Sequence, residues 1–152
     1  MAVTAKSRAR TALHSTTVLK PEDTLAAVKQ AISQVKGGGT SLLTSGVVNA
    51  GARVHIERES PAGLEMSITS GKRLVELCTF SAVTEAADGK TVLRVGGLET
   101  FKTSQSRLLG FIPMGPASIT GFSLYKRFLD EIATRLRTED PQAVVSIDVP
   151  KA

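Results

Sequence analysis

The alternation of apolar and polar residues along the chain predicts a mixed α+β protein. Residues 12–19 are rich in β-branched side chains, which favour a first strand. Pro21 suits the first position of a helix, and three glycines at 37–39 suit its end, because glycine adopts a left-handed cap at little cost. Apolar residues at helical spacing predict the buried stripe of this helix: Leu25, Val28, Ile32 and Val35.

The middle of the chain has the pattern of β structure. Strands are expected at 40–48, 52–59, 64–68, 73–83 and 91–102. In the second and third of these, apolar and polar residues alternate, which is typical of a sheet with one wet face. The segment 73–83 is apolar on both faces, so we expect a cover on both, with a helix on one side and a partner subunit as a candidate for the other. Asp88-Gly89 predicts a hairpin turn, and Gly96-Gly97 predicts a bulge or a sharp bend.

The final third of the chain carries most of the large rings. Five of the six aromatic residues lie there: Phe101, Phe111, Phe122, Tyr125 and Phe128. A strongly amphipathic helix is expected from about residues 117–121 to Arg137, with Ser118 or Thr120 as its cap. Its apolar face comprises Phe122, Tyr125, Leu129, Ile132 and Leu136. Residues 144–149 follow it either as a short strand or as a docked extended tail.

The connection at 108–114 is apolar, although loops normally run over the surface and are polar. This segment therefore has two interpretations. It packs down as a plug over the sheet, or it forms an exposed apolar patch that marks a binding site or a subunit interface.

Composition and charge narrow the class of protein. A chain of 152 residues with 41% hydrophobic and 22% charged residues fits one globular domain. Four basic residues lie near the ends of the chain: Lys6, Arg8, Arg10 and Lys151. Without these four, 15 of the 19 basic residues remain against 14 acidic ones, so the body is nearly neutral despite the net charge of +5. We expect a basic flexible tail at 1–11 and a single α+β domain at 12–152, and the charge distribution argues against nucleic-acid binding.

Other features of the sequence concern the location of the protein in the cell. No apolar run approaches the roughly 20 residues that span a bilayer, so no membrane partner is expected. The basic N-terminus lacks the apolar stretch of a secretory signal. Cys78 is the single cysteine, which excludes an internal disulfide and favours a reducing, cytoplasmic location.

Candidate chemistry is sparse. His14, His55 and Cys78 do not supply the four ligands of a zinc site, so we expect no metal and no other cofactor. Cys78 lies among apolar neighbours and is expected to act as a small buried hydrophobe, and the alternation around His55 predicts that this side chain faces water. No glycine series matches a phosphate-binding loop.

Three polar residues fall inside otherwise apolar elements. Glu76 and Arg94 lie on strands that we expect to pair around the Asp88-Gly89 turn, and an ion pair between them would be either structural or part of a pocket. Tyr125 adds a hydroxyl to the apolar face of the last helix. This hydroxyl is either a handle for a ligand or a donor to a backbone carbonyl.

The predicted order of elements resembles a known fold. Ser15-Thr16-Thr17-Val18 leads into Pro21-Glu22-Asp23, a double glycine follows at 96–97, and antiparallel strands precede a long C-terminal helix. Over residues 12–138 this order resembles the helix-grip fold of the START and polyketide-cyclase-like superfamily. The predicted elements give an antiparallel sheet of five to seven strands, one helix after the first strand and a long C-terminal helix packed on the sheet. The resemblance implies that the sheet is curved around this last helix and that an apolar cavity lies between them.

These observations lead to three functional hypotheses. The first is a non-enzymatic module that binds a small apolar ligand between the sheet and the last helix, with 108–114 as a lid. The ligand-binding residues would be Met66, Ile68, Phe80, Leu93, Val95, Phe122, Tyr125 and Leu129. The second is a homodimeric structural or interaction protein that associates through 73–83 and 108–114. The third is a cyclase- or hydrolase-like enzyme, which requires Tyr125, Glu76 and Arg94 to converge.

Overall fold

The computed structural model describes residues 8–35, 53–69, 76–101, 103–108, 112–119 and 121–148. The strand predicted at 40–48, the glycines at 37–39, residues 73–75 and part of the apolar 108–114 segment lie outside these residues. Within the described part of the chain, no helix is long and apolar enough to cross a membrane.

The elements follow the predicted α+β order. They are β1 (Ala12–Thr17), α2 (Pro21–Gln34), β2 (Arg53–Ser60), β3 (Gly63–Thr69), β4 (Glu76–Ala87), β5 (Lys90–Gly96), β6 (Thr100–Phe101), β7 (Thr103–Leu108), β8 (Ile112–Ile119), α4 (Phe122–Glu139) and β9 (Val144–Asp148). Seven strands form one antiparallel sheet in the order β2-β3-β4-β5-β1-β9, with β6 paired to β4. The predicted fold class, a sheet with one helix after the first strand and a long C-terminal helix packed on it, is confirmed.

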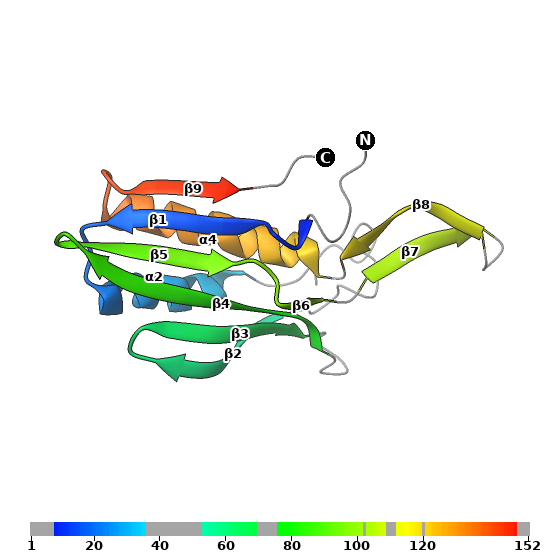
Figure 1. Ribbon diagram of the computed structural model, residues 1–152, viewed down its shortest axis with the longest axis horizontal. Helices are drawn as coiled ribbons and strands as arrows, with labels where there is room; N and C mark the ends of the chain where they lie inside the picture. Colours follow the sequence, from blue (N-terminus) through cyan, green and yellow to red (C-terminus); the bar gives the residue numbers. More distant parts are fainter. Residues whose placement is uncertain are drawn as a thin grey trace.

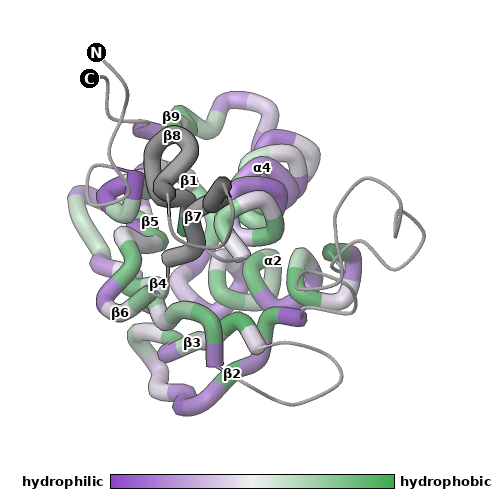
Figure 2. Tube along the Cα trace, turned by 90° about the vertical axis from the view of Figure 1, so that its right-hand side faces the viewer, coloured by the Kyte–Doolittle hydropathy of each residue, from purple (hydrophilic) through white to green (hydrophobic). Residues whose placement is uncertain are grey.

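Helices α2 and α4 lie on the same side of the sheet (Figures 1 and 2). Helix α2 packs against α4 and against β4 and β5, and α4 also contacts β1 and β9. We call the covered side of the sheet the inner face and the opposite side the outer face. Alternation along each strand assigns its residues to one or the other.

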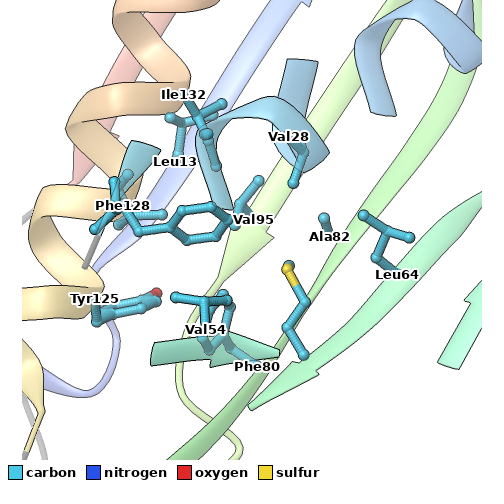
Figure 3. Packing of buried hydrophobic residues seen from close by; sticks show 14 of the residues in the cluster. Leu13, Val28, Val54, Leu64, Phe80, Ala82, Val95, Tyr125, Phe128 and Ile132 are labelled. Atoms are coloured by element: carbon cyan, nitrogen blue, oxygen red, sulfur yellow. The ribbon is translucent and has the colours of Figure 1, made fainter. Parts of the chain in front are cut away.

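The inner face carries the apolar core (Figure 3). Helix α4 buries a wider arc than the predicted stripe, because it packs against both the sheet and α2. Its buried residues are Leu124, Tyr125, Phe128, Leu129, Ile132, Ala133 and Leu136. The ring of Phe80 lies 4.9 Å from that of Tyr125 and 5.7 Å from that of Phe128, centroid to centroid. Such edge-to-face and tilted contacts are favourable for aromatic rings and fix the position of α4 on the sheet.

A β-bulge explains why 73–83 looked apolar on both faces. Ile68 pairs with Cys78 and Thr69 with Glu76, so Leu77 is an extra residue in β4. Leu77 and Cys78 are both buried, whereas Val83, which a regular strand would place on the same face as Leu77, is 52% exposed. The bulge therefore turns the Leu77 side chain toward the covered side of the sheet. C-terminal to Leu77, no described helix covers the outer face of β4.

The double glycine ends β5, as the predicted bend requires. Gly96 has φ +90°, and a Cβ atom there would lie 1.9 Å from the Tyr125 hydroxyl oxygen. Only glycine therefore fits between β5 and α4 at this point. The strand predicted at 91–102 is divided as a result, with β6 pairing to β4 after the bend.

The structure corrects two predictions around α4 and decides between the two alternatives for the segment that follows it. The helix begins at Phe122 with Gly121 as its N-cap (φ 86°) and no side-chain cap, so the prediction of a Ser118 or Thr120 cap is wrong. Residues 112–119 form strand β8, paired with β7 in a hairpin off the end of the main sheet, rather than a loop and the first turn of the helix (Figure 1). After α4 the chain forms the edge strand β9, which selects the strand over the docked tail.

Polar contacts fasten the C-terminal end of α4 to the sheet. Asp140, at the end of α4, accepts hydrogen bonds from the Thr17 hydroxyl (2.8 Å) and the Val18 N–H (3.1 Å) through Oδ2. The Arg137 guanidinium donates to the carbonyl of Val145 on the edge strand β9 (3.1 Å). Both contacts join the C-terminal helix to the β1–β9 side of the sheet.

Candidate functional site: the outer face of the sheet

The eight predicted ligand-binding residues converge on the inner face, where they pack on one another. Seven of them are at most 1% exposed: Met66, Ile68, Phe80, Leu93, Val95, Tyr125 and Leu129. Phe122 is partly buried against the same cluster, and its ring centroid lies 6.1 Å from that of Tyr125. The space between the sheet and α4 is thus occupied by the protein's own side chains, and the ligand site there stays a prediction.

The Tyr125 hydroxyl has a partner within the chain. It donates a hydrogen bond to the backbone carbonyl of Thr11, and the side chain is fully buried. Burial raises the pKa of Tyr125, with the nearby Cys78 as a smaller cause, so the hydroxyl stays protonated at neutral pH. Of the two alternatives for this group, the structure selects the bond to a backbone carbonyl.

The three groups required by the enzyme hypothesis do not meet. Arg94 pairs with Val83 across β4 and β5, whereas Glu76 lies at the start of β4 opposite Thr69 of β3. The predicted ion pair between Glu76 and Arg94 is therefore wrong, because the register brings the far end of β4 to β5. Glu76 and Arg94 are exposed and Tyr125 is buried on the inner face, which leaves no shared pocket for the three.

Cys78 and the histidines offer little chemistry. Burial raises the pKa of the Cys78 thiol to about 12, with the charge of Glu76 as a second cause, so the reactive thiolate is rare at neutral pH. His14 lies 3.5 Å from Asp148 at the β1–β9 end of the sheet, and His55 is half-buried on β2. In the part of the chain that the structure describes, no group of three His, Cys, Asp or Glu residues could hold a metal ion.

The outer face contains a hollow of about 360 Å³ at one end of β3 and β4, and its walls are mainly apolar. It is lined by residues 58–60, 62–65 and 81–83. Glu65, Ser81 and Val83 alternate with the buried Leu64 and Ala82, so their side chains point away from the helices.

Gly63 explains why the hollow is open. A Cβ atom on Gly63 would lie 2.6 Å from the carbonyl oxygen of Ala82, so the close approach of β3 to β4 excludes any side chain there. The rim is polar, with the Arg58 guanidinium 3.7 Å from the Glu65 carboxylate, and both side chains are largely exposed. Sequence reasoning missed this site, because Pro61-Ala62-Gly63 looks like an ordinary turn and only the strand register turns its glycine into the floor of a hollow.

A second feature of the outer face lies beside the hollow. Val83, Glu85, Val92 and Arg94 occupy adjacent positions on β4 and β5 and alternate with buried inner-face residues. Val83, Glu85 and Arg94 are exposed, and Val92 is half-buried. The outer face thus combines apolar surface with both signs of charge, over strands that no described helix covers.

Comparison with known proteins adds no relative, since no protein-family model and no curated protein matches the chain. The assignment of a function therefore depends on the geometry of the outer face.

Proposed function

We propose that this protein is a non-enzymatic module that binds a small, mainly apolar molecule in the hollow beside Gly63. The observation that carries the proposal is the hollow itself. Its volume of about 360 Å³ falls in the range of about 300–1,000 Å³ that is usual for small-molecule sites. Its apolar walls and charged rim are also the combination that such sites have.

The rim suggests what kind of molecule would fit. Arg58 is 83% exposed and only loosely paired with Glu65, so its guanidinium is available to a carboxylate at the mouth of the hollow. The apolar part of such a ligand would lie over Gly63 and against Val83. A medium-chain carboxylate has this pattern of an apolar body and one anionic end.

We propose a non-enzymatic role because the described residues with shifted pKa values owe these shifts to burial in the core or to hydrogen bonds that hold the fold together. Cys78 and Tyr125 owe their raised pKa values mainly to burial in the core, and Asp140 owes its lowered pKa first to the N–H of Val18 and then to the hydroxyl of Thr17. None of these three residues lines the hollow.

Octanoate, with 1-octanol as an uncharged control, tests the proposal. In a titration followed by backbone amide NMR, we expect saturable shifts at residues 63–65 and 81–83, with weaker binding of octanol. Ser81→Phe, which fills the hollow from β4, should weaken octanoate binding by at least about tenfold, which corresponds to about 1.4 kcal/mol. The same substitution type at a distance, Thr16→Phe on β1, is the matched control and should leave binding unchanged.

The outcomes of this titration distinguish the two candidate ligand sites, which are the hollow beside Gly63 and the space between the sheet and α4. Saturable shifts around Phe80, Tyr125 and Leu129 in place of the hollow would overturn the proposed site and support the site predicted between the sheet and α4. Absence of saturable shifts with both probes up to millimolar concentration would overturn the proposal. Unchanged affinity in Ser81→Phe would do the same.

A further inference from the structure

The four outer-face residues of β4 and β5 have an internal pattern of their own. We call Val83, Glu85, Val92 and Arg94 the β4–β5 patch. The register pairs Val83 with Arg94 and Glu85 with Val92, so the four form a quadrilateral on two neighbouring strands. Its two valines lie on one diagonal and its two charges on the other. Residues that are diagonal neighbours across strands are still within reach of long side chains.

Within the described part of the chain, the two charges of the patch have no ion-pair partner. Among the residues that the structure describes, neither Glu85 nor Arg94 forms an ion pair, although each is exposed. Val83, with 52% of its surface exposed, stands between them on the outer face. Val83 therefore lies between an acidic and a basic side chain, neither of which has an ion-pair partner among the described residues. Both charges remain available to a binding partner.

We infer that the partner of this patch is a second copy of the same chain. A two-fold axis that lies in the interface along the Val83–Val92 diagonal exchanges the two ends of the other diagonal. Each valine then meets its own counterpart, Glu85 meets Arg94 of the second copy, and Arg94 meets Glu85 of the second copy. No like charges of the patch face each other. The patch is therefore self-complementary in the way that an isologous dimer interface requires.

The direction of the axis fixes how the two sheets cross. Because the diagonal runs obliquely to the strands, the strands of the two copies cross at a steep angle, nearer the orthogonal class of sheet packing than the aligned class. Val83 also forms a wall of the hollow, so the second copy lies next to the proposed ligand. The dimer does not depend on the ligand, however, because the charges of the patch do not line the hollow.

A charge exchange in the full chain tests the inference. Sedimentation velocity over a range of protein concentrations should show a monomer–dimer equilibrium in the unmodified protein. Glu85→Arg alone and Arg94→Glu alone each place like charges opposite one another, so each should weaken the dimer at least about tenfold. The double variant Glu85→Arg/Arg94→Glu restores opposite charges across the axis and should restore the dimer. Arg53→Glu, on β2 of the same sheet but outside both the patch and the hollow, should leave the equilibrium unchanged.

Each other outcome contradicts the inference. A strict monomer at every concentration would remove the dimer, and a dimer that tolerates both single reversals would locate its interface elsewhere. A double variant that stays monomeric would show that Glu85 and Arg94 do not meet across the axis. Thermal melting of each variant confirms that it is folded. Octanoate binding, measured on the Arg94→Glu variant, keeps the outcome for the hollow separate from the outcome for the dimer.

Discussion

The inner and outer faces of the same sheet follow different physical rules. On the inner face, apolar side chains of β3, β4 and β5 meet those of α2 and α4, and the rings of Phe80, Tyr125 and Phe128 lie in contact. On the outer face, valines and charges alternate with the buried rows, and Gly63 leaves a hollow. Packing density constrains the first face, so its residues determine the fold. The second face is free of that constraint, so its residues are available for binding.

The largest expected difference between the faces is in the free energy of unfolding. Phe80→Ala removes a fully buried ring and should cost about 3–5 kcal/mol. Val83→Ala, three residues along the same strand but on the outer face, should cost less than about 1 kcal/mol. Urea denaturation of both variants at low protein concentration measures the contrast. Similar losses for the two would show that the outer face is as tightly constrained as the core.

An intermediate effect is expected where α4 meets the end of β5. Tyr125→Phe removes the hydrogen bond to the Thr11 carbonyl and should cost about 1–2 kcal/mol. Gly96→Ala forces a Cβ atom into the tyrosine hydroxyl and should cost more than Tyr125→Phe. In the double variant the hydroxyl is gone, so the combined loss should be smaller than the sum of the single losses. Simple additivity in this cycle would mean that Gly96 is required for its backbone conformation alone.

The smallest effect should appear as a pH dependence at the clamp between α4 and β1. The pKa of Asp140 is lowered first by the hydrogen bond from the Val18 N–H and then by that from the Thr17 hydroxyl, with the Gln142 N–H and the charge of Lys90 contributing. A lowered folded-state pKa means that the ionised form stabilises the fold at neutral pH, and that this contribution is lost as the pH falls below about 3.9.

Asp140→Asn should therefore melt below the unmodified protein at pH 7, and the two melting temperatures should converge below about pH 3.9. Thr17→Val, which removes one donor, should show a smaller difference with the same direction. A constant difference between Asp140→Asn and the unmodified protein across this range would show that the carboxylate charge plays no part.

Sequence patterns predicted the inner face well and the outer face poorly. Burial imposes a period on the residues that meet a neighbouring layer, so the stripe of α4 and the strand at 64–68 could be read directly. The Asp88-Gly89 turn and the bend at Gly96-Gly97 were also predictable, because few residues other than glycine suit such positions.

The failures have identifiable physical causes. The apolar residues of 73–83 were assigned to two faces because a bulge changes the period, and no local signal marks the extra residue Leu77. Residues 112–119 looked like a loop because two prolines interrupt the segment, yet they form one strand of a two-stranded hairpin. Glu76 and Arg94 were paired because the register of β4 against β5 was unknown, and register depends on long-range packing rather than on adjacent residues.

The hydrogen bond from Arg137 to the carbonyl of Val145 has a consequence for how copies of the chain can join. β9 is the last strand of the sheet, and an exposed terminal strand can recruit the strand of another molecule and start fibril growth. A guanidinium already bound to one of its acceptors makes such recruitment less favourable. At the opposite edge of the sheet, β2 carries the charged residues Arg53, Glu57, Arg58 and Glu59, which also oppose strand addition. The dimer proposed through the broad surface of the sheet would then be a finite pair instead of an open-ended polymer.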